Sequence, residues 1–201
     1  MKKTYYFGLF FLFIQIIVIL RNYIIGYNYF FWYCDFAPLL LSISFFINNR
    51  AAVKAIINFG LIPQVIFLID FLYITYGKMS PFGIATSLLE FNAFSIYATI
   101  FIHLTTIFAL IITLRDKPDK KTLLYSISII FFIYFITLLF TSPSGDINWV
   151  YSINIPIKIF NFSIQKITYV WTVLAFLLVV LTQCIQYFIY RLTKKNIKSY
   201  N

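Results

Sequence analysis

The chain has 201 residues, of which 62% are hydrophobic and only 11% carry a formal charge. Soluble domains carry roughly 25% charged residues, so this composition excludes an ordinary soluble domain. The net charge of +10 does not indicate nucleic-acid binding, because the basic residues lie at the ends of apolar runs, where they anchor and orient membrane helices. The length fits a single integral membrane domain over residues 1–201.

Charged residues divide the chain into six long apolar spans. A bilayer core takes about 20 apolar residues per helix, and apolar spans of this length must be helices to satisfy their backbone in lipid. The basic start of the chain is not followed by the small-residue cleavage pattern of a secretory signal, so the first span is expected to be a retained helix. The predicted fold is all-α, a polytopic bundle of six transmembrane helices at about 4–20, 28–48, 55–76, 91–114, 122–141 and 167–190.

The distribution of Lys and Arg predicts the orientation of this bundle. With the N-terminus inside, the predicted inner segments hold twelve of the sixteen Lys and Arg residues. The outer segments hold the other four, Arg21, Lys78, Lys158 and Lys166. The positive-inside rule therefore predicts that both termini lie in the cytoplasm.

Two acidic residues lie within predicted helices. At a rise of 1.5 Å per residue, Asp35 and Asp70 are each predicted to lie about 9 Å below the outer boundary of the membrane core. No Lys or Arg lies within a predicted helix core to neutralise them, and an unpaired charge in the membrane costs several kcal/mol. Two interpretations stay open: a shared outer pocket that binds a proton, a cation or a ligand, or separate roles in which each acid caps a loop or a helix end.

Other polar residues extend the predicted pocket. The fourth helix carries a narrow polar stripe that includes His103, the only histidine, and this stripe is expected to face the bundle interior. Gln64 follows Pro63 in the third helix, and Asn148 in the last outer loop could fold over the site with Asp146. The predicted ligand-binding residues are Asp35, Asp70, His103, Gln64 and Asn148. Cys34 and Cys184 are too few and too far apart for a disulfide framework or a metal site, so no metal and no cofactor are expected.

Several of these residues carry a resemblance. Phe-Trp-Tyr-Cys-Asp-Phe-Ala at 31–37, Pro63-Gln64, Asp70-Phe-Leu, His103 and Ile-Asn-Trp-Val at 147–150 are similar to a group of uncharacterised small bacterial membrane proteins. This resemblance implies about six helices and a multi-pass protein of the bacterial cytoplasmic (inner) membrane, and it brings no activity. More remotely, Pro63-Gln64 resembles PQ-loop carriers, and an early Cys with a later His resembles YwaF-like proteins and membrane enzymes of lipids.

Three functions follow as expectations. The first is a carrier or binder of a small or lipid-like ligand, coupled to protons or cations, with an outward-facing polar pocket. The second is a lipid acyltransferase or hydrolase that uses Cys34 as nucleophile and His103 as base. The third is a membrane scaffold without catalysis. The expected partners are the lipid bilayer, a small-molecule or lipid ligand, and a proton or cation.

Overall fold

The computed structural model describes residues 3–77, 79–142, 147–150 and 168–198. Within them the chain is all-helical. Its α-helices are α1 (Lys3–Ile25), α2 (Tyr33–Phe46), α3 (Arg50–Thr75), α4 (Ala93–His103), α5 (Thr105–Ile112), α6 (Lys120–Phe140) and α7 (Thr168–Lys198). Short 3-10 turns are η1 (Tyr27–Phe31), η2 (Thr86–Glu90) and η3 (Ile147–Trp149).

Five spans are long and apolar enough to cross a membrane: α1, α3, α4 with α5, α6, and most of α7. The sixth predicted crossing, α2, is a shorter apolar helix of 14 residues, or about 21 Å. It begins five residues later than predicted, because η1 occupies the start of the predicted span. The all-helical fold is therefore confirmed, with five spans long and apolar enough to cross a membrane, and the number of crossings is part of the proposal below.

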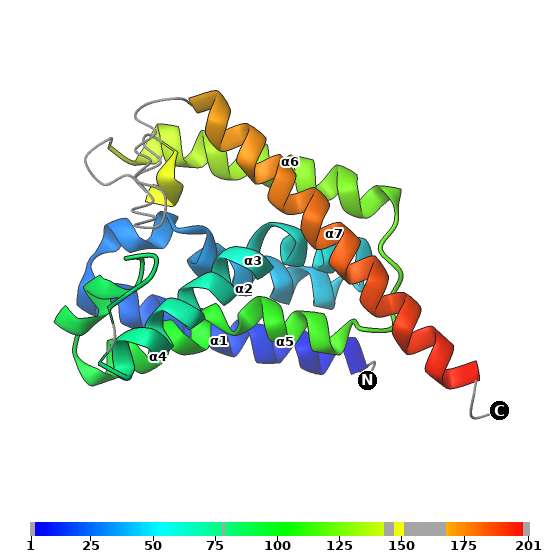
Figure 1. Cartoon of the computed structure of the whole chain (residues 1–201), viewed down its shortest axis with the longest axis horizontal. Coiled ribbons are helices and arrows are strands. Elements are labelled where there is room, and N and C mark those ends of the chain that lie inside the picture. The colour runs from blue at the N-terminus through cyan, green and yellow to red at the C-terminus, as the bar shows by residue number, and fades with distance from the viewer. Residues whose placement is uncertain (1–2, 78, 143–146, 151–167, 199–201) are drawn as a thin grey trace.

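The helices form three groups. α1 and the α4–α5 pair lie on one side, α6 and α7 lie on the other, and α2 and α3 lie between them (Figure 1). α3 is the most buried of the long helices and packs against α2, α5, α6 and α7. The main hydrophobic core contains side chains of all these elements, among them Phe11, Leu41, Ile57, Ile102, Ile133 and Val179.

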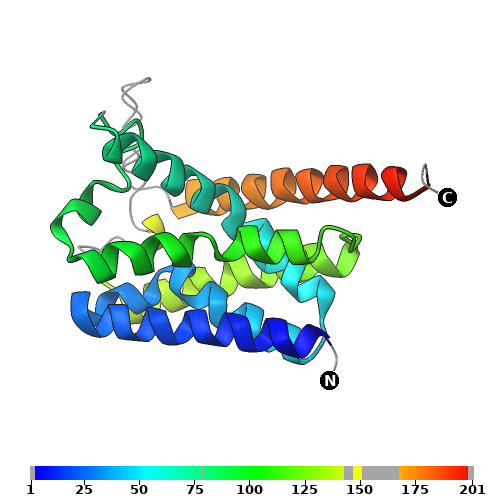
Figure 2. The same cartoon turned by 90° about the horizontal axis from the view of Figure 1, so that it is seen from below.

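The start of α1 and the end of α7 lie at the same end of the bundle (Figure 2). The α2–α3 and α5–α6 connections lie at that end too, and the three 3-10 turns lie at the opposite end. The chain therefore runs from one end of the bundle to the other an even number of times. The end that carries the 3-10 turns is the one predicted to face outward, and it is called the outer end below.

Two helices differ from prediction in ways that shape the site. α1 does not end at Leu20 but continues to Ile25 and ends before Gly26, whose φ of 128° is accessible mainly to glycine. Arg21 therefore lies inside a helix. The predicted helix 91–114 is also divided, because the backbone turns at Leu104 between α4 and α5.

Candidate functional site

An ion pair joins α1 to α2 near the outer end of the bundle. Arg21 Nη2 lies 3.3 Å from Asp35 Oδ2, and Asn22 Nδ2 donates to the same oxygen at 2.7 Å. All three side chains are buried, and Arg21 is only 3% exposed. The prediction that no basic residue neutralises Asp35 was wrong, since Arg21 was treated as the charge that ends the first helix.

The guanidinium of Arg21 is only partly used by this pair. Arginine offers five N–H donors, yet Nε and Nη1 of Arg21 are buried without an acceptor among the described residues. The aromatic ring of Tyr29 lies 5.9 Å from the guanidinium carbon, which adds a cation–π contact. Asn22 Oδ1 is likewise buried without a donor. Buried polar groups are nearly always hydrogen-bonded, so this cluster is the least satisfied polar region at the outer end.

His103 is the last residue of α4 and belongs to the same region. Its Nδ1 lies 2.8 Å from the carbonyl oxygen of Thr99, and its ring stacks on Phe67 with centroids 3.6 Å apart. α4 packs against α1, the helix that carries Arg21, so His103 and the ion pair lie on neighbouring helices. The polar stripe of α4 and α5 is buried as its spacing predicts, at Ser95, Thr99, His103 and Thr106, while Asn92 is the exposed N-cap of α4.

Gln64 stabilises the break between α4 and α5. Its Oε1 accepts from the backbone N–H of Thr106 at 3.2 Å and from the hydroxyl of Thr106 at 2.7 Å. An interrupted helix leaves backbone donors that lipid cannot satisfy, so a side chain from α3 takes that role. Nε2 of Gln64 stays without an acceptor among the described residues. Gln64 and His103 thus lie beside one break.

Asp70 is separate from this cluster. Its Oδ1 accepts from the hydroxyl of Ser80 at 2.6 Å and the N–H of Phe82 at 3.0 Å, while Oδ2 accepts from the N–H groups of Ile84 and Ala85 at 2.8 Å each. The two acids therefore have different partners. These contacts do not support the expected sharing of one proton or cation between Asp35 and Asp70. Asp70 instead holds the connection between α3 and α4.

That connection covers part of the site. Ala85 and Leu88 pack on Phe67, the residue that stacks on His103. Asp70 therefore acts on the site indirectly, because it fixes the segment that covers Phe67.

Asn148 has a structural role. Its Oδ1 accepts from the backbone N–H of Tyr33 at 2.7 Å, which caps the start of α2 from a distant part of the chain. Its Nδ2 donates to the carbonyl of Phe31 and to the hydroxyl of Thr137, and its own carbonyl accepts from the indole of Trp171. Both polar atoms of the Asn148 side chain are therefore occupied by structural contacts, and Asp146 lies outside the described residues.

Cys34 does not form the expected pair with His103. Its thiol lies 3.6 Å from Asp35 Oδ1, and Nδ1 of His103 faces Thr99. Within the described residues, no hydrogen bond joins Cys34 to His103.

The inner half of the bundle holds a second polar cluster that the sequence analysis missed. Asn58 of α3 donates to Ser126 of α6 at 3.0 Å and to Gln183 of α7 at 2.6 Å, and it accepts from Gln186 at 2.6 Å. Lys54 is buried nearby without a partner for its ammonium among the described residues. The amide side chains at 58, 183 and 186 are the signal that could have revealed it, since amides commonly join membrane helices.

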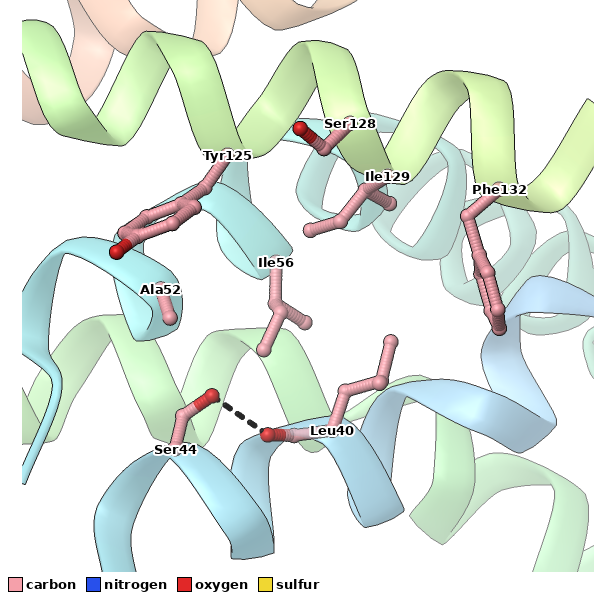
Figure 3. A pocket seen from close by; sticks show the side chains of 8 residues that line it. All are labelled: Leu40, Ser44, Ala52, Ile56, Tyr125, Ser128, Ile129 and Phe132. Atoms are coloured by element: carbon pink, nitrogen blue, oxygen red, sulfur yellow. Dashed lines mark hydrogen bonds between the residues drawn. The ribbon is translucent and has the colours of Figure 1, made fainter. Parts of the chain in front are cut away.

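The cavity in Figure 3 is a different feature. It has a volume of about 270 Å³ and lies between α2, α3 and α6, with Leu40, Ile56, Ile129 and Phe132 in its wall. The nearby hydroxyl of Ser44 is turned to the carbonyl of Leu40, as the dashed line shows. None of the predicted ligand-binding residues lines this apolar cavity, so it is not the predicted polar pocket.

Comparisons with known proteins add no relative: no family model, no curated protein and no solved structure matches the chain. The resemblance stated from the sequence therefore stays a prediction. What the chain and its fold define is an all-helical membrane protein with a buried polar cluster toward one end.

Proposed function

We propose that the protein is a membrane-embedded carrier for a small ligand, and that the ligand binds around Arg21, Asp35 and His103. In this proposal the chain crosses the bacterial cytoplasmic membrane six times, with both termini inside. The site then opens from the outer side.

One observation carries the proposal: Arg21 is buried, and two of its nitrogens lack an acceptor within the part of the chain that the structure describes. An unpaired donor costs more free energy on a buried charged group than on a buried neutral group. A protein therefore keeps such a charged group where a ligand binds it. A structural ion pair alone would not require the free nitrogens.

The broken helix supports the same site. The α4–α5 break lies next to His103, and carriers commonly place substrate sites where membrane helices are interrupted. Coupling to a cation shared by Asp35 and Asp70 is not favoured, because each acid has its own donors. Coupling to protons through Asp35 stays within the proposal.

The enzyme alternative has no contact in its favour, since the thiol of Cys34 is directed at Asp35. The scaffold alternative is an outcome of the test. Purified protein in proteoliposomes is offered a panel of labelled anionic, neutral and cationic metabolites, and uptake is measured. The site variant is the double substitution Arg21→Gln/Asp35→Asn, which removes both charges together.

A matched control removes an ion pair at the other end of the bundle. Arg50 and Asp116 lie 3.2 Å apart and both are partly exposed, so Arg50→Gln/Asp116→Asn changes the same charges away from the site. We expect uptake of at least one solute by the wild type and the control, and none by the site variant. Equal uptake by the site variant, or no uptake of any solute by the wild type, would contradict the carrier function and favour a scaffold.

A further inference from the structure

We infer that the ligand is a monovalent anion and that it enters the site together with one proton, which Asp35 accepts. This inference rests on the proposed function and names its substrate class. It follows from the unpaired donors and from the charge balance of the site.

The unpaired groups of the site are mainly donors. Nε and Nη1 of Arg21 lack acceptors among the described residues, whereas Asn22 Oδ1 is the unpaired acceptor beside the ion pair. A ligand that satisfies this cluster must therefore offer mostly acceptor atoms. Carboxylates match a guanidinium best, because they accept two N–H bonds in one plane.

The charge balance then requires a proton. Arg21 and Asp35 form a neutral pair, and both are almost completely buried. An added anion would leave the site with a net negative charge, which a membrane interior strongly disfavours. If a proton from the aqueous phase binds the Asp35 carboxylate, the site is neutral again. The Nη2 donor of Arg21 is then released toward the ligand.

Ligands of other charge fit the site less well. A cationic ligand would be repelled by Arg21, and a neutral ligand would not replace Asp35 as its partner. A divalent anion would need a second proton.

Cys34 and Tyr29 are titratable side chains in contact with the pair. Cys34 already donates toward Asp35 Oδ1, and Tyr29 contributes the face of its ring to Arg21. His103 is the competing proton acceptor. Its Nδ1 faces a carbonyl and so carries hydrogen, which leaves Nε2 as the site where the neutral ring would accept a proton.

The test is calorimetric titration of the detergent-purified full chain with sodium acetate, sodium benzoate and sodium nitrate. Acetamide is the neutral control, and tetramethylammonium sulfate, whose counter-ion is divalent, is the cationic control. Titration at one pH in two buffers of different ionisation enthalpy measures the protons taken up per ligand, and repetition from pH 6 to pH 8 measures the pH dependence.

We expect at least one anion to bind with uptake of about one proton, with affinity falling about tenfold per unit rise in pH. Asp35→Asn should bind the anion without proton uptake and without this pH dependence. His103→Gln alters a residue of the site and so changes the affinity, but each anion that it binds should still bring about one proton. Because Asp35→Asn leaves Arg21 unpaired and can fail to fold, the slope in the wild type tests the inference independently.

The results that would overturn this inference can be distinguished from those that would overturn the proposed function. Binding of an anion by the wild type without proton uptake, or loss of uptake in His103→Gln instead of Asp35→Asn, overturns the coupling. Uptake of only neutral or cationic solutes in the vesicle assay, with no anion bound, overturns the anion and keeps the carrier. Absence of any binding and any uptake overturns both.

Discussion

Replacing Asp70 by Asn should detach the segment that covers Phe67 without unfolding the bundle. The amide keeps one oxygen, so at most two of the four donors at this carboxylate keep an acceptor. The new NH₂ group would face two donors, for example the N–H groups of Ile84 and Ala85. Each buried donor left unpaired costs about 1–3 kcal/mol, so closure of this segment should weaken by about 2–6 kcal/mol.

Hydrogen–deuterium exchange of the protein in nanodiscs measures this local opening. A loss of 2 kcal/mol or more accelerates exchange of the protected amides in 80–90 by about thirtyfold or more, while the α1 and α6 amides keep their rates. Glu90→Gln is the matched control, because it makes the same chemical change at an exposed side chain of the same segment. Unchanged exchange at Ile84 and Ala85 in Asp70→Asn would refute the anchoring role of this acid.

Three further predictions concern packing and caps. Gly60→Ala should lower the free energy of unfolding by about 1–3 kcal/mol, because the new Cβ would lie 2.6 Å from the Tyr33 ring and 2.8 Å from the Thr106 methyl. Gly8→Ala, which meets only the half-exposed ring of Phe46, should cost less in the same denaturation assay, and equal costs would contradict this packing. Asn148→Ala should reduce stability by about 2–5 kcal/mol in thermal melts, since it leaves the cap of α2 and its other partners unpaired, and an unchanged melt would argue against that cap. The hydrogen bond from the backbone of Thr122 holds the pKa of Asp119 below its ordinary value of 3.8, so this acid stabilises the fold above that pH and stops doing so as the pH falls through its lowered pKa. The stability difference between the wild type and Asp119→Asn should therefore shift against the wild type below about pH 4 in acid titrations, and a constant difference would contradict this cap.

The helices could be predicted from the sequence because apolar length is a local property. The span 122–141 agrees with α6 to within two residues, and the span 55–76 agrees with the end of α3, which begins five residues earlier at Arg50. The predicted helix boundaries were wrong where a charged residue was interpreted as the edge of the membrane. Arg21 is followed by further helical residues up to Ile25, and only the ion pair with Asp35, fourteen residues away, explains its burial.

The site was predicted only in part, because its contacts join distant positions. Asp35 and His103 lie on helices that pack together, α2 and α4. Asp70, predicted at the depth of Asp35, is instead bound by the hydroxyl of Ser80 and by backbone groups twelve to fifteen residues further on. No Pro or Gly at Leu104 predicts the break there, and the break depends on Gln64 of another helix. Asn148 offered a usable signal, since Asn tolerates the positive φ of 54° that it adopts.

The central claim is that Arg21 and Asp35 form one buried unit inside the membrane. A double-mutant cycle tests it, with the free energy of unfolding measured for the wild type, Arg21→Gln, Asp35→Asn and the double variant. Each single substitution leaves one buried charge unpaired and should cost about 3–5 kcal/mol. The double variant should be no less stable than either single one, which is a coupling of about 3 kcal/mol or more. Additive costs, with the double variant less stable by the sum of the two, would contradict it.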